Sequence, residues 1–129
     1  MYKRQEFAAF GDLFLTEIRD YRIKVLSETN ILPIFPIWTN DTKNLAKTIL
    51  DMGIRAVVTC VDTSKIDSFW IGKPFDETFL GSLPDGTDPC GENGEFHTFV
   101  FDGPLFTNAI EYTLGAPGKI KNFEFVSVD

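Results

Sequence analysis

The chain has 129 residues, 43% of them hydrophobic and 14% aromatic, so it can bury a core and does not belong to the disordered class. Its formal net charge of −7 argues against nucleic acid and against an anionic membrane surface as partners. No apolar run reaches the ~18 residues of a membrane span. The two cysteines lie far apart in the sequence, which makes a disulfide unexpected and a cytoplasmic location the default.

An amphipathic helix is expected over residues 6–28, because apolar residues recur every three or four positions and share one face. They are Phe7, Phe10, Phe14, Ile18, Tyr21 and Val25. Gly11 is a poor helix former, so Gly11-Asp12 indicates either close approach of the backbone to another group or a helix that starts at Asp12. No convincing cap precedes residue 6, and the chain is therefore expected to begin abruptly.

A short apolar strand is expected next, over residues 31–38. Pro33 and Pro36 argue against a regular central position for it in a sheet. A capping cluster at 39–42 predicts the start of a second helix, which Gly53 ends.

Residues 54–61 form a β-branched run that predicts a buried strand, with Asp62 at its carboxyl end. The order of strand, helix and strand predicts a βαβ unit whose two strands pair in parallel. Ligands favour the carboxyl ends of such strands, but a lone aspartate there is more often a cap or loop residue.

The second half of the chain predicts a short helix over 75–83 and an alternating strand over 96–102. Two further alternating runs, 110–114 and 123–128, are separated by the glycine- and proline-containing segment 115–118 and predict an antiparallel hairpin. The chain is therefore expected to be α/β, and exposed hairpin edges could pair between copies.

Chemistry-bearing residues concentrate in segment 88–99, DPCGENGEFHTF, which leads from two turn signals into the alternating strand at 96–102. A glycine-rich loop of this kind exposes backbone N–H groups while the strand fixes the side chains. Glu92 and Glu95 could bind a cation or move protons, and His97 could act as acid, base or hydrogen-bond donor. The alternative is a solvated turn. No HExxH or CxxC spacing is present, so no metal site is expected.

Several segments together resemble the diphthine–ammonia ligase family, which belongs to the ATP-pyrophosphatase group. They are DPCGENGEFHTFVFDGPLF at 88–106, Gly11-Asp12-Leu13-Phe14-Leu15, Ile18-Arg19, Tyr21-Arg22 and Pro36-Ile37-Trp38. The resemblance covers nearly the whole chain. It implies that residues 1–40 are the end of a Rossmann-like (HUP-type) ATP-binding domain and that 41–129 are the family's C-terminal substrate domain.

The family's SGGxDS phosphate loop does not occur in this sequence. The resemblance therefore implies a C-terminal part of a longer enzyme, which would be a poor catalyst by itself. The final strand runs to Asp129 without a stop signal, so residues beyond it are expected as well.

The reaction implied by the resemblance is an ATP-dependent amidation that Mg²⁺ assists. The carboxylate of diphthine on elongation factor 2 is adenylated, and ammonia then displaces AMP. Gly11 and Asp12 are implied to lie beside the nucleotide. The signature loop is implied to meet the acceptor, with Glu92, Glu95 and His97 as catalytic residues and with Asp88, Asn93, Gly94 and Thr98 as substrate-binding residues.

Two positions depart from the family pattern and widen the choice of acceptor. Asn93 stands where glycine is common, and His97 stands where an acid is common, so another carboxylate is an alternative acceptor. A nucleotide or small-molecule binding module without ligase activity, and a homo-oligomerisation domain, are the alternative functions.

Overall fold

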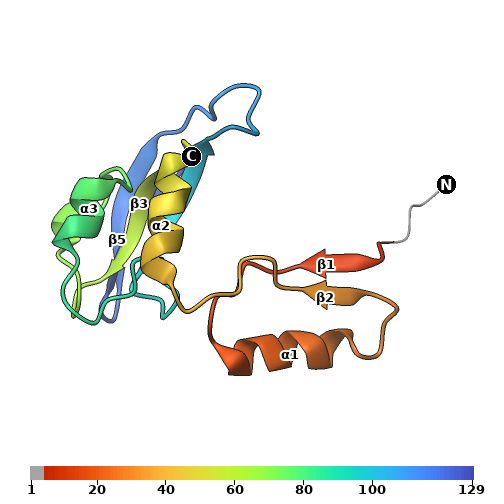
Figure 1. Ribbon diagram of the computed structural model, residues 1–129. Helices are drawn as coiled ribbons and strands as arrows, with labels where there is room; N and C mark the ends of the chain where they lie inside the picture. The colour runs from red at the N-terminus through yellow and green to blue at the C-terminus, as the bar shows by residue number, and fades with distance from the viewer. Residues whose placement is uncertain (1–4) are drawn as a thin grey trace. The chain divides into compact units, whose positions relative to one another are not determined.

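The computed structural model describes residues 5–129, which divide between Thr42 and Lys43 into two compact units (Figure 1). The first unit contains β1 (Phe7–Ala9), α1 (Thr16–Leu26) and β2 (Leu32–Ile34). Helix α2 (Thr42–Asp51) begins at the boundary, and after it come β3 (Arg55–Asp62), the 3₁₀ helix η1 (Ser68–Trp70), α3 (Glu77–Ser82), β4 (Phe96–Asp102), β5 (Leu114–Ile120) and β6 (Phe123–Val128). The expected mixed α/β class is confirmed. The assignment of the two parts to an ATP-binding and a substrate domain stays a prediction.

In the first unit, β1 and β2 pair in parallel and α1 connects them, so a βαβ unit does form, but not where it was predicted. The expected helix over 6–28 is wrong for its first ten residues, since α1 begins at Thr16 rather than at residue 6 or Asp12. The backbone before it bonds to β2: the Leu32 N–H donates to Glu6 O, and the Phe10 N–H donates to Ile34 O, each at 2.9 Å. Interstrand bonding thus overrides the helical spacing of the phenylalanines.

The second unit is built on a four-stranded sheet with the order β4-β3-β6-β5, in which all pairs are antiparallel. The predicted parallel pairing of segment 31–38 with segment 54–61 is therefore wrong, because β2 pairs with β1 and β3 lies between β4 and β6. Segment 31–38 yields only three strand residues, among them Pro33, which lacks an N–H for a ladder. Strand β3 instead takes partners of six and seven residues from much later in the chain.

Helices α2 and α3 both contribute to one hydrophobic core with β3 and β4. Phe79 of α3 is fully buried, and its ring centroid lies 5.0 Å from that of Phe96 and 5.3 Å from that of Trp70, both in edge-to-face geometry. The buried members of the core are Ala46, Ala56, Val58, Val61, Ile66, Phe75, Phe79 and Phe96. Phe96 is the first residue of β4, so core packing fixes the point at which the chemistry-bearing loop joins the sheet.

Most other elements of the second unit confirm the sequence expectations. Helix α2 and helix α3 lie where the patterns placed them, Gly53 follows α2 with φ of 76°, and β4 has the predicted bounds. The C-terminal hairpin also forms, but its first strand is β5 rather than the predicted run 110–114. Segment 115–118, which was expected to be the turn, lies inside β5. The chain reverses at Lys121-Asn122, where Lys121 has φ of 53°. In the part of the chain described here, no helix is both long and apolar enough to cross a membrane.

Replacing Phe79 with alanine should destabilise the second unit by about 3–5 kcal/mol, because the substitution removes a fully buried ring and leaves a cavity. Phe69→Ala is the matched control: its ring is 63% exposed, so a loss of about 1 kcal/mol or less is expected. Urea denaturation followed by circular dichroism measures both. Equal losses would show that the ring of Phe79 is not central to the core.

Candidate functional site

Asp88 organises the turn of the chemistry-bearing loop with its side chain. Its Oδ2 accepts hydrogen bonds from the backbone N–H groups of Cys90 at 3.2 Å and Glu92 at 2.9 Å, while its backbone carbonyl accepts from Gly91 N–H at 2.9 Å. Asp88 is 8% exposed, so these bonds form largely out of water. The carboxylate predicted to bind substrate is therefore occupied in holding residues 88–92 in one conformation.

Glu95 lies at the base of the same loop and is only 1% exposed. Its Oε1 accepts from the Asp88 backbone N–H at 3.1 Å and from Asn93 Nδ2 at 3.3 Å. Its Oε2 is buried and receives no hydrogen bond from any residue between 5 and 129. A buried carboxylate oxygen without a donor is costly, so this atom is an open acceptor for an N–H or O–H group that residues 5–129 do not supply.

Glycines at positions 91 and 94 permit the tight path of the loop, with φ of 69° and 79°. At Gly91 the requirement is also steric, because an added Cβ would lie 2.9 Å from the carbonyl oxygen of Phe96. At Gly94 an added Cβ would have no neighbour within 4 Å. The Gly94 N–H donates to the Gly91 carbonyl at 2.9 Å. Its contribution is therefore the left-handed backbone rather than close packing.

His97 and Thr98 lie beyond the loop on β4 and point to opposite faces of the sheet, because side chains alternate along a strand. His97 pairs with Cys60 across to β3, and Thr98 pairs with Val58. Both are exposed, and the side chain of His97 makes no hydrogen bond or ion pair within residues 5–129. The structure thus brings Asp88, Asn93 and Glu95 together and leaves His97 outside their network.

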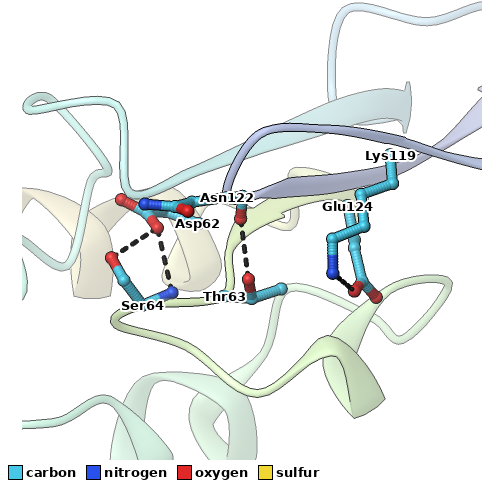
Figure 2. Close-up of polar contacts among 6 residues, drawn as sticks. All are labelled: Asp62, Thr63, Ser64, Lys119, Asn122 and Glu124. Atoms are coloured by element: carbon cyan, nitrogen blue, oxygen red, sulfur yellow. Dashed lines mark hydrogen bonds and ion pairs between the residues drawn. The ribbon is translucent and has the colours of Figure 1, made fainter.

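The carboxyl end of β3 adjoins this loop, because the Asp62 N–H donates to the Glu95 carbonyl at 2.8 Å. Figure 2 shows that the Asp62 side chain turns toward Ser64, whose backbone N–H and hydroxyl donate to Oδ1 at 3.0 and 2.6 Å. The Ser64 hydroxyl thereby lowers the pKa of Asp62. Asp62 is a turn-forming residue in this structure, as lone aspartates at strand ends often are.

The tip of the C-terminal hairpin is tied to the same end of β3. The backbone N–H and the hydroxyl of Thr63 both donate to the Asn122 carbonyl at 2.8 Å (Figure 2). Beside the tip, Lys119 Nζ lies 2.9 Å from Glu124 Oε1 and lowers the pKa of that glutamate. The pair is largely exposed and is expected to add little stability. Sequence patterns did not reveal this neighbourhood, because Asn122 is 59 residues from Thr63.

Neither cysteine is in a disulfide, and both are partly buried. Burial, followed by the charges of Asp88 and Glu92, raises the pKa of Cys90 to about 11. Burial, followed by the charge of Asp62, also raises the pKa of Cys60. Neither thiol is therefore activated as a nucleophile.

The two residues implied to lie beside a nucleotide belong to the first unit. Asp12 Oδ2 lies 3.3 Å from Arg22 Nε in a part-buried ion pair. Gly11 is exposed, and an added Cβ would come no nearer than 4.0 Å to Ile37, so packing does not require glycine there. Across residues 5–129, no group of three or more His, Cys, Asp or Glu side chains is placed to hold a metal ion.

Gly91→Ala should destabilise the second unit more than Gly86→Ala does. Both substitutions place alanine at a positive φ, 69° and 84°, which costs about 1–2 kcal/mol. Only at position 91 does the new methyl group collide with backbone, since nothing lies within 4 Å of a Cβ at position 86. Thermal denaturation compares the two. An equal loss of stability would mean that the Phe96 carbonyl does not constrain the loop.

In a Cys60→Ser variant, Cys90 should react with iodoacetamide at pH 8 roughly a hundredfold more slowly in the folded than in the urea-unfolded chain. This is the ratio of thiolate fractions expected for pKa values of about 11 and 9.0. Between these values the folded state keeps the proton that the unfolded state loses, so stability should fall as pH rises from 9 toward 11. Similar reaction rates in the two states would contradict the burial of this thiol.

Comparison with known proteins places the chain in a family. Residues 41–124 match the model of the diphthamide synthase C-terminal domain. Over 102 residues, the chain is 30% identical to bovine diphthine–ammonia ligase and 29% identical to the human protein of that name, a match that covers 74% of this chain. The chain spans 38% of the length of these relatives. Because the family model matches most of the chain, including the entire Asp88–Glu95 loop, the protein belongs to the diphthamide synthase C-terminal domain family.

Proposed function

We propose that the chain is the acceptor-binding part of an ATP-dependent ligase that joins ammonia to a carboxylate, with diphthine on elongation factor 2 as the first candidate acceptor. The family and the name of its bovine relative support this reaction class. The observation that carries the proposal is the open Oε2 atom of Glu95. It stands within the loop that the sequence marks as the family signature.

The chemistry of Oε2 favours ammonia or ammonium over the trimethylammonium group of diphthine. A buried acceptor without a partner, such as Oε2, requires a hydrogen-bond donor. Ammonia and ammonium carry N–H bonds, whereas a trimethylammonium group carries none. Glu95 is therefore assigned to the nitrogen donor. Glu92 is half-buried in the same turn, and its charge is assigned to attracting the cationic group of the acceptor.

In the amidation step, the ammonia nitrogen forms a bond to the activated carbonyl carbon, and the bond from that carbon to the AMP oxygen breaks. The nitrogen must lose a proton as it becomes an amide. Glu95 accepts this proton through Oε2, while its Oε1 stays bonded to Asp88 N–H and Asn93 Nδ2 and so keeps the carboxyl group in place. His97 is the second candidate base, because it is exposed on the adjoining strand.

Among residues 5–129, no set of side chains is arranged as a site for Mg²⁺. The described residues contain no carboxylate or histidine cluster that fits a metal ion, and Asp12 is already paired with Arg22. The sequence also has no SGGxDS segment to hold phosphates. The proposal therefore assigns no residue of the described chain to nucleotide activation, and the relatives are longer than the region that this chain matches.

Ammonium binding tests the proposed role of Glu95 on the 129-residue chain. Titration with ammonium chloride, followed by ¹⁵N–¹H correlation spectra at constant ionic strength, should shift the amides of Asp88 and Gly94 saturably. Tetramethylammonium chloride should not shift them, because it cannot donate a hydrogen bond. Glu95→Gln should abolish the ammonium response, whereas Glu77→Gln, an exposed acid of α3, should leave it unchanged. Equal responses to both cations would remove Glu95 from the nitrogen site.

Turnover tests the ligase reaction itself, on the protein as its gene encodes it. With ATP, Mg²⁺ and ¹⁵N-ammonium, the label should enter diphthine-bearing elongation factor 2 as an amide, and Glu95→Gln should lower the rate at least tenfold. ATP binding without acceptor-dependent release of pyrophosphate would instead favour a binding module without ligase activity.

A further inference from the structure

Strand β4 is one edge of the four-stranded sheet, and most of its outer side has no backbone partner among residues 5–129. In the strand order β4-β3-β6-β5, β4 pairs only with β3. Outside that ladder, one backbone hydrogen bond reaches β4 from the described residues, from the Ile110 N–H to the Phe101 carbonyl at 2.7 Å. Phe101 is the last residue but one of β4, so this bond leaves the outer side before it uncovered.

The register of β3 and β4 identifies the groups on that outer side. Val58 donates a backbone hydrogen bond of 2.9 Å to segment 72–75 and accepts one of 2.8 Å from it, and the Ala56 carbonyl accepts one of 2.9 Å from the same segment. Both residues therefore direct these groups away from β4. Their partners in the antiparallel ladder are Thr98 and Val100, which must direct their own N–H and C=O groups outward, since facing residues of such a ladder exchange either both bonds or none.

The composition of β4 does not protect this edge against pairing. Sheet edges are commonly blocked by proline, which lacks an N–H, or by lysine. The opposite edge, β5, contains both Pro117 and Lys119, whereas the β4 sequence FHTFVFD contains neither residue type. The side chains of Thr98 and Val100 are exposed, so a further strand can approach the edge.

The uncovered edge leads into the candidate loop at 88–95. Strand β4 begins at Phe96, directly after Glu95, and Thr98 is three residues from that glutamate. At about 3.3 Å per strand residue, this separation is roughly 10 Å. A polypeptide that pairs with Thr98 and Val100 can therefore continue along β4 and bring a side chain a few residues further on to the loop.

We propose that the outer edge of β4 binds an extended segment of the acceptor protein, which pairs through its backbone with Thr98 and Val100. The inference rests on the proposed function, because a carboxylate that is carried on a protein brings a polypeptide backbone with it. When a peptide adds a strand to a sheet edge, the main-chain hydrogen bonds supply the affinity. Charge favours this occupant over a second copy of the chain, since two copies carry −7 each, whereas the diphthine residue carries a cationic group.

Exchange of amide protons with solvent, measured residue by residue in ¹⁵N–¹H spectra of the 129-residue chain, tests the edge. In the free chain the amides of Thr98 and Val100 should exchange rapidly, whereas that of Phe99, which faces β3, should exchange slowly. A synthetic peptide that spans the diphthine residue of elongation factor 2 should slow exchange at Thr98 and Val100 at least tenfold and change that of Phe99 less than twofold. Unchanged exchange at Thr98 and Val100 overturns the proposal.

Two substitutions at one position separate the backbone bond from the side chain. Val100→Pro removes the outward N–H without removing a bond to β3, and it should weaken binding of the peptide at least tenfold. Val100→Thr keeps both the N–H and the branched shape, and it should change the affinity less than threefold. Far-UV circular dichroism checks that both variants keep the fold, and equal affinities of the two folded variants would contradict backbone pairing.

Two further readings distinguish this proposal from its alternatives. If rising chain concentration slows exchange at Thr98 and Val100 without peptide, the edge is an interface between copies and the proposal is overturned. The ammonium titration of Asp88 and Gly94 is recorded on the same sample. An ammonium response without protection by the peptide rejects the edge and retains the nitrogen site, whereas protection without an ammonium response retains the edge and removes Glu95 from the nitrogen site.

Discussion

The antiparallel pairing of β3 with β4 determines where the candidate loop at 88–95 lies. Val61 and Phe96 are partners in this ladder, and both are buried in the core with Phe79. The pairing continues one step further, because the Asp62 N–H bonds to the Glu95 carbonyl. Glu95 is thereby drawn beneath the loop at the edge of the core, where water cannot solvate its carboxyl group.

Around this buried carboxylate, the polar groups of the loop differ in whether they have a hydrogen-bond partner. Asp88 and Asn93 form hydrogen bonds within the loop, so their role in this structure is to fix its conformation. The second oxygen of Glu95 lacks a partner among residues 5–129 and is the one group whose chemistry calls for a ligand. A site that is rigid around one open acceptor suits a small nitrogen donor better than a large flexible one.

The first unit presents a different kind of chemistry from the loop. Its βαβ unit carries guanidinium groups stacked on aromatic rings, whereas the loop presents carboxylates.

Local patterns in the sequence by themselves determined α2, β3, α3 and β4, since each has a clear hydrophobic period and a turn or cap residue at its ends. They also marked segment 88–99 as the chemistry-bearing loop. Only the tertiary structure decided strand pairing. Residues 6–10 became a strand edge because β2 offered hydrogen bonds, and β3 took antiparallel partners because longer strands lay later in the chain. The burial of Glu95 and the stacking of Arg19 on Trp38 could not be predicted from the sequence either, because a side chain's environment depends on residues distant in sequence.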